Sequence, residues 1–118
     1  RDPDGLAMSS RNAYLSPAER ASALALPLAL SEAVRRWAAG ERVPDRLVAG
    51  LRERIGAAVD SIDYVEIVDS ATLADLDRGA PAPGGALLAV AARVGRTRLI
   101  DNVELGVDPE PIRRPARA

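Results

Sequence analysis

Residues 86–105 read ALLAVAARV-GR-TRLIDNVEL, and this stretch decides the fold. The first nine residues are mostly apolar and have the length of a buried strand. Gly95-Arg96 separates them from a second nine-residue segment that also suits a strand, and a glycine-containing pair at this spacing is typical of a tight hairpin turn. The stretch therefore predicts a β-hairpin with strands at 86–94 and 97–105.

A third strand is predicted upstream of the hairpin. Residues 63–68 read DYVEIV, which is rich in β-branched and aromatic side chains. Residues 72–77 predict a short helix with Thr72 near its cap. The prolines and glycines within 81–85 then mark a loop into the hairpin.

Two helices are predicted before the strands. The first begins with Ser16-Pro17-Ala18-Glu19, a capping box with proline in the first turn, and Gly40 stops it. Its apolar residues recur at helical spacing: Ala23, Leu26, Leu30, Ala33, Val34 and Trp37. An interior proline costs a helix about 3 kcal/mol, so Pro27 predicts a kink or a break near Leu26.

The second helix is expected after Val43, with Pro44 in its first turn and Gly56 near its end. Three strands and two main helices predict an α+β fold, in which a small, mainly antiparallel sheet packs against the two helices, with additional short helical turns. We expect one domain over residues 1–105. The segment 106–118 is rich in proline and arginine and predicts a disordered tail.

Composition limits the classes of function. The 118 residues carry a formal charge of −1, which provides no global field for nucleic acid or an anionic membrane. No apolar run approaches the roughly 20 residues that span a bilayer, and no signal-peptide pattern is present. The lack of cysteine agrees with a cytoplasmic location. We expect neither nucleic acid nor membrane as a partner.

Two residue types are missing. Without histidine, the chain lacks the commonest metal ligand and the usual proton carrier near neutral pH, so a metal site is not expected. Without lysine, all 16 basic residues are arginine, and any side-chain cation that binds an anion must be a planar guanidinium.

The segment with the clearest potential to bind a ligand is residues 4–12, DGLAMSSRN. Hydroxyls at Ser9 and Ser10 and the guanidinium of Arg11 could converge with backbone N–H groups on phosphate oxygens. An ordinary polar loop before a capped helix explains the same residues equally well. Asp4 is better interpreted as part of a turn, because its carboxylate would repel phosphate.

Other polar residues favour structural roles. Strand alternation places Arg98 and Asn102 on one face and Asp101 on the other, which indicates solvated positions or internal ion pairs. Asp63 and Glu66 are expected to be surface carboxylates. No pair of acids has a spacing that demands acid–base chemistry.

Three blocks of sequence resemble one family in the same order. They are residues 4–12 with the following Tyr14-Leu15-Ser16, residues 63–66 (DYVE), and residues 95–102 (GRTRLIDN). Together they resemble the C-terminal domain of the pantothenate synthetases (pantoate-beta-alanine ligases). The resemblance covers nearly the whole chain except its last dozen residues.

The resemblance implies an ATP-dependent ligase that joins pantoate to beta-alanine through a pantoyl-adenylate. It implies that Ser9 and Ser10 donate to β- or γ-phosphate oxygens of ATP and that Arg11 stabilises charge on the leaving pyrophosphate. The Met8 backbone would lie near the adenine, with its side chain packed. The loop would be carried on a hinged lid over the active site.

The family's other signatures are missing from this chain. Its His-x-Gly-His motif and a phosphate-binding lysine belong to a Rossmann domain, which we expect to precede Arg1. The chain alone is therefore expected to be inactive. The resemblance also implies that the full-length enzyme is a homodimer and uses Mg²⁺, for which no ligands are identifiable here. A non-catalytic protein-interaction module, using Trp37 and the arginine-rich tail, is the alternative.

Overall fold

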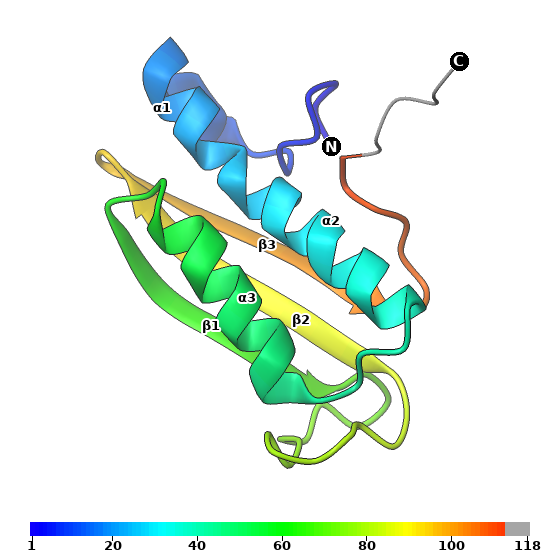
Figure 1. The fold of residues 1–118 in the computed structure, drawn as a ribbon. Helices are drawn as coiled ribbons and strands as arrows, with labels where there is room; N and C mark the ends of the chain where they lie inside the picture. The colour runs from blue at the N-terminus through cyan, green and yellow to red at the C-terminus, as the bar shows by residue number, and fades with distance from the viewer. Residues whose placement is uncertain (113–118) are drawn as a thin grey trace.

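The computed structural model describes residues 1–112, which form a three-stranded antiparallel sheet of order β1-β2-β3 with two helices across one face (Figure 1). The elements are η1 (Ser10–Tyr14), α1 (Pro17–Ala23), α2 (Ala25–Ala38), α3 (Pro44–Gly56), β1 (Ser61–Asp69), β2 (Ala86–Val94) and β3 (Thr97–Leu105). The predicted α+β architecture is confirmed. No helix in the described part of the chain is long and apolar enough to cross a membrane.

The β2–β3 hairpin has the predicted boundaries. Val94 pairs with Thr97, which leaves Gly95 and Arg96 as the two-residue turn. Gly95 has a φ of +58°, as the first position of a type II′ turn requires. The positive φ is the constraint that favours glycine, and the Glu19 carboxylate lies close beside this position.

The predicted short helix over residues 72–77 is wrong. Asp69 ends β1, and its carboxylate accepts hydrogen bonds from the backbone N–H groups of Ala71 and Thr72, both at 2.9 Å. These bonds turn the chain back and hold the pKa of Asp69 below its ordinary value. Asp75 then forms an isolated bridge with Val68. Leu73 has a φ of +61°, outside the right-handed helical region, and Asp69 N donates to Ala74 O at 2.9 Å, so the chain turns back instead of continuing as a helix.

The first predicted helix is divided in two. Its capping box is confirmed: Ser16 Oγ accepts from Glu19 N at 3.1 Å, and Ser16 N donates to Glu19 Oε1 at 2.9 Å. The break near Pro27 is also confirmed, and it falls at Leu24, between α1 and α2. Pro27 has no N–H for the carbonyl of Ala23 and crowds that turn, so proline sits in the first turn of a new helix instead.

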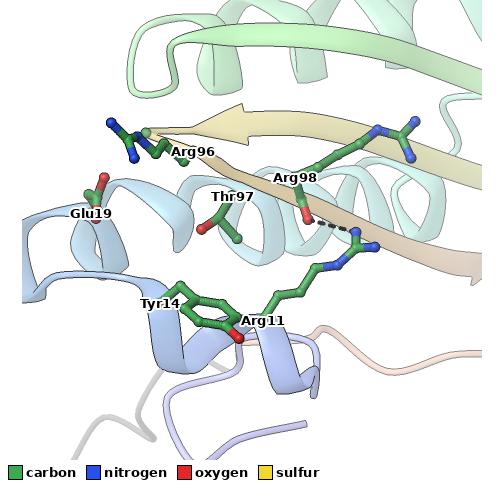
Figure 2. A pocket seen from close by; sticks show the side chains of 7 residues that line it. Arg11, Tyr14, Glu19, Arg96, Thr97 and Arg98 are labelled. Carbon is green, nitrogen blue, oxygen red and sulfur yellow. Dashed lines mark hydrogen bonds between the residues drawn. The ribbon is translucent and has the colours of Figure 1, made fainter.

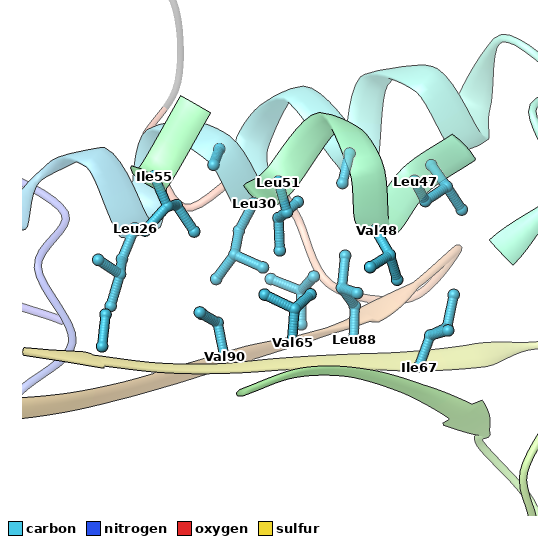
Figure 3. Packing of buried hydrophobic residues seen from close by; sticks show 14 of the residues in the cluster. Leu26, Leu30, Leu47, Val48, Leu51, Ile55, Val65, Ile67, Leu88 and Val90 are labelled. Atoms are coloured by element: carbon cyan, nitrogen blue, oxygen red, sulfur yellow. The ribbon is translucent and has the colours of Figure 1, made fainter. Parts of the chain in front are cut away.

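The core lies between the helices and the inner face of the sheet (Figure 3). Leucines of α2 and α3 interleave with aliphatic side chains of β1 and β2; the residues labelled there are Leu26, Leu30, Leu47, Val48, Leu51, Ile55, Val65, Ile67, Leu88 and Val90. Trp37 belongs to the same cluster at 7% exposure, and the Arg42 guanidinium stacks 4.0 Å from its ring centroid. The indole is therefore a core residue rather than an exposed stacking platform.

Residues 106–112 lie along α2. The backbone N–H of Ile112 donates to the hydroxyl of Ser31 at 2.8 Å, and Glu110 forms an ion pair with Arg35. These contacts differ from the disordered tail predicted over 106–118. Residues 113–118 lie outside the described residues, and for them disorder stays a prediction.

Shortening a core side chain should destabilise the chain far more than shortening an exposed one on the same sheet. Leu30→Ala removes a side chain with 0% exposure and should lower the free energy of unfolding by about 2–5 kcal/mol. Ile100→Ala, at 59% exposure on β3, should cost about 0.5 kcal/mol. Urea denaturation measures both, and equal losses would contradict the assigned core.

Candidate functional site

The loop over residues 4–12 is attached to the core at its base. Leu6 is 2% exposed and joins the main hydrophobic cluster. Before it, Gly5 N donates to Asp2 O at 2.8 Å and Asp2 N donates to Leu6 O at 2.9 Å, which closes a tight turn. Gly5 has a φ of +96°, a conformation that side-chain-bearing residues rarely adopt. The loop thus begins from a fixed turn.

Arg20 of α1 holds both acidic side chains of this turn. Its Nε lies 2.8 Å from Asp4 Oδ2, and its Nη2 lies 2.9 Å from Asp2 Oδ2 and 3.0 Å from Asp4 Oδ1. The hydrogen bonds from Arg20 lower the pKa of both carboxyls. Asp4 therefore has the structural role that the sequence indicated, and its charge is neutralised by Arg20.

Asn12 closes the other end of the loop. It is 8% exposed, and its Nδ2 donates to Ala7 O at 3.0 Å and to Asp2 Oδ2 at 3.2 Å. Asn12 thus satisfies the Ala7 carbonyl of the loop. Its buried Oδ1 has no hydrogen-bond partner within the described residues.

Ser9, Ser10 and Arg11 are exposed at the start of η1. Ser9 Oγ accepts from Arg11 N at 3.1 Å, so this hydroxyl caps the 3-10 turn and keeps its own proton to donate. Arg11 Nη1 lies 3.5 Å from the Arg98 carbonyl oxygen, and no carboxylate within residues 1–112 pairs with the guanidinium. The segment presents a cation and two hydroxyls to solvent.

The expectation that the Met8 side chain packs is wrong within the described residues. Met8 is 74% exposed, because the neighbouring Leu6 occupies the apolar site beneath the loop. An exposed methionine costs little when it stands alone.

A groove of about 820 Å³ separates η1 and α1 from the β2–β3 turn. Its lining residues are Arg11, Tyr14, Glu19, Gly95, Arg96, Thr97 and Arg98. In Figure 2, Arg11 extends from the η1 segment toward β3, and the Tyr14 ring lies along η1 with its hydroxyl toward Arg11, whereas the Arg98 guanidinium lies on the other side of the strand. There Arg98 Nε pairs with Asp63 Oδ2 at 2.7 Å.

The groove favours an anionic occupant. Arg11 and Arg96 contribute cationic side chains, and Glu19 is the carboxylate among the lining residues. Glu19 already accepts from the backbone N–H of Ser16 in the capping box. Nothing in the sequence places the hairpin turn beside η1, so Tyr14, Arg96 and Thr97 were not predicted as neighbours of the loop.

Arg98 and Asp101 on β3 form ion pairs, in agreement with the prediction of solvated positions or internal ion pairs. Alternation along β3 buries Asp101 at 6% exposure and leaves Arg98 and Asn102 on the opposite face. Asp101 pairs with Arg1, and Arg98 pairs with Asp63. Residues 1–112 contain no cluster of three or more acidic, histidine or cysteine side chains that could hold a metal ion.

Comparisons with known proteins agree on one family. The family model for pantoate-beta-alanine ligase matches residues 1–104. The pantothenate synthetase of Anaeromyxobacter dehalogenans is 55% identical over 105 residues, which cover 89% of this chain and 35% of that protein. A bifunctional pantoate ligase/cytidylate kinase of Gloeobacter violaceus is 50% identical over 115 residues, which cover 97% of this chain and 21% of that protein.

A solved structure agrees with the sequence relatives. The crystal structure of pantothenate synthetase from Thermus thermophilus superposes with a TM-score of 0.75 at 35% identity, covering 96% of this chain and 38% of that one. The chain thus spans little more than a third of the length of these single-activity relatives.

The pKa of Asp4 should depend on Arg20. Because the folded pKa is below the ordinary value of 3.8, the ion pairs stabilise the folded loop above about pH 4. This contribution is lost as the pH falls through the lowered pKa. In Arg20→Gln, a carboxyl-detected NMR titration should show the pKa of Asp4 rising toward 3.8, with Asp63, which pairs with Arg93 and Arg98, unchanged. An unaltered Asp4 titration would contradict the assigned ion pair between Arg20 and Asp4.

Proposed function

Because the chain belongs to the pantoate-beta-alanine ligase family, we propose that it forms the ATP-phosphate-binding lid of such a ligase. The complete enzyme joins pantoate to beta-alanine and makes pantothenate through a pantoyl-adenylate. Since this chain spans 35% of the Anaeromyxobacter relative, the remaining parts of the active site belong to the rest of the full-length enzyme. In this proposal that remainder includes the Rossmann domain.

The observation that carries the proposal is the separation of charges in the loop. Arg20 binds both Asp2 and Asp4 at the base, whereas Arg11 has no carboxylate partner within the described residues. A guanidinium that is free of acidic partners and beside two exposed hydroxyls suits the dispersed charge of a triphosphate. The loop's own acids do not compete for that cation.

Each residue of the loop has a separate role in this proposal. Ser9 and Ser10 donate hydrogen bonds to β- or γ-phosphate oxygens. Arg11 stabilises the charge that develops on pyrophosphate as it leaves. The Met8 backbone lies near the adenine. These interactions require donors that are already in place, and the cap from Ser9 Oγ to Arg11 N fixes the first turn of η1.

The chemistry requires no nucleophile from the protein. A carboxylate oxygen of pantoate attacks the α-phosphorus of ATP and pyrophosphate leaves, which gives pantoyl-adenylate. The amine of beta-alanine then attacks the acyl carbon, AMP leaves, and the ammonium nitrogen loses a proton. The lid contributes position and electrostatics, and its closure keeps water from hydrolysing the acyl-adenylate.

The alternative function, a non-catalytic interaction module, has less support. It requires Trp37 as part of a partner surface, but the indole is 7% exposed and stacked under Arg42. Its other support is the arginine-rich tail, whose arginines at 113, 114 and 117 lie outside the described residues.

Replacing Arg11 by alanine in the full-length enzyme should slow adenylate formation without unfolding the protein. Loss of a donor that acts on developing charge typically lowers the rate by about 10²–10³. Quenched-flow measurement of pyrophosphate release in a single turnover gives that rate, and a thermal melt gives the stability. The loss should appear in the rate rather than in the melting temperature, because Arg11 is exposed.

Arg52→Ala is the matched control, because Arg52 is an exposed arginine on α3, away from the loop. It should leave the adenylation rate unchanged. If Arg11→Ala retains the wild-type rate, or if Arg52→Ala lowers the rate equally, the role proposed for Arg11 is wrong.

The isolated chain should release no AMP when it is given ATP, pantoate and beta-alanine. Addition of a separately produced N-terminal part of the full-length enzyme should restore AMP release, because the two halves of the site can then meet. Chromatographic quantification of AMP tests this. Activity of the chain alone would contradict the proposed division of the site.

A further inference from the structure

We propose that the ion pair between Arg1 and Asp101 positions the loop over residues 4–12 for binding the phosphates of ATP. This inference rests on the proposed function and assigns Arg1 and Asp101 as positioning residues. Neither side chain belongs to the Met-Ser-Ser-Arg segment itself. They act through the turn from which that segment extends.

The ion pair between Arg1 and Asp101 is bidentate, and its geometry is restricted. Arg1 Nη1 lies 2.7 Å from Asp101 Oδ2, and Arg1 Nη2 lies 2.7 Å from Asp101 Oδ1, so the guanidinium and the carboxylate meet through two parallel bonds. The Asp101 side chain is 5% exposed, whereas that of Arg1 is 28% exposed. Asp101 Oδ1 also accepts from Asn102 N at 2.8 Å, which restricts the carboxylate further.

The Arg1–Asp101 ion pair connects the sheet to the loop. Asp101 lies in the middle of β3, opposite Val90 of the central strand. The same Nη1 atom of Arg1 that binds Asp101 also donates to Gly5 O at 2.9 Å. One guanidinium therefore fixes the carbonyl of the turn with respect to the sheet, and the loop continues from this turn to Arg11.

Two further sets of contacts restrict the turn to one position. A side chain on residue 5 would collide with Ile112, so the backbone packs directly against the segment that follows β3. Arg20 binds the acidic side chains from α1. Leu6 adds an apolar contact with the core, and among the polar supports the Arg1–Asp101 pair is the one that reaches the buried sheet. Loss of either partner should let the turn shift relative to β3.

A small displacement of the loop would matter for catalysis. An error of about 1 Å in a group that positions substrate can cost roughly 100-fold in rate. Arg11 reaches back to β3 through a long contact of 3.5 Å with the Arg98 carbonyl, and this contact alone holds its guanidinium weakly. The position of the Arg11 guanidinium therefore depends on the loop backbone, which the Arg1–Asp101 ion pair positions.

Amide hydrogen exchange of the full-length enzyme tests the positioning directly. In Asp101→Asn, the amides of residues 5–12 should exchange about tenfold faster or more, while those of α3 should stay protected. Arg1→Gln should have the same effect, and because Arg1 lies at the surface this variant avoids the risk of a damaged core. Arg1→Lys should fall between, since lysine keeps the charge but not the two-bond geometry. Unchanged exchange in Asp101→Asn and Arg1→Gln would overturn the inference.

A double-mutant cycle tests the link to Arg11. Asp101→Asn alone should raise the KM for ATP and slow adenylation roughly 10- to 100-fold, with little change in the affinity for pantoate. In the Arg11→Ala background, the same substitution should have a much smaller effect, because the residue it positions is absent. If Asp101→Asn slows adenylation equally in the wild-type and Arg11→Ala backgrounds, the ion pair does not act through Arg11. Its role would then be a general one in the stability of the protein.

Asp45→Asn is the control substitution, because Asp45 pairs with Arg78 at the start of α3, at the opposite end of the fold from η1 (Figure 1). It should leave both the exchange of the loop and the KM for ATP unchanged. If Asp101→Asn accelerates exchange but Arg11→Ala leaves adenylation intact, the ion pair still positions the loop. In that case the proposed function is the part that fails.

Discussion

The structure depends on the burial of one apolar face of a three-stranded sheet beneath two helices. Leucines of α2 and α3 fill the space above β2, the strand with a neighbour on both edges. Each such side chain contributes about 1.5–3 kcal/mol when it leaves water, and no polar feature of the chain approaches that sum. Leu6 joins the same core, so the burial that stabilises the sheet also fixes where the functional loop begins.

Beyond the burial of Leu6, the loop obtains its order from ion pairs. Arginines anchor it at two places, Arg20 through Asp2 and Asp4, and Arg1 through Asp101. Guanidinium groups suit this task because they bind carboxylates through paired bonds and stay charged at every physiological pH. Both anchors engage acidic side chains near the loop, so these carboxylates do not pair with Arg11.

Membership of the ligase family gives this arrangement a context. The family match ends at residue 104, close to the end of β3, and the matched relatives contain much more chain than this domain. A lid that supplies one guanidinium and two hydroxyls has little binding energy of its own. In the proposed enzyme its value lies in closing over a nucleotide that the remainder of the site already holds, so that the cation acts in a water-poor environment.

Local rules in the chain predict the secondary structure where they are strong: the capping box at Ser16, the break before Pro27 and the hairpin turn at Gly95. The sequence also predicted a phosphate site in the loop, because hydroxyls, arginine and turn residues stand together in the chain, and that site stays a prediction. The short helix predicted over 72–77 is absent because Leu73 adopts a φ of +61° and Asp75 forms a bridge with Val68, a tertiary pairing that local propensity does not reveal. Only the tertiary structure decided which charges meet. The partners in Arg1–Asp101 are separated by 100 residues, and such a pair forms only after burial of the sheet has brought distant segments together.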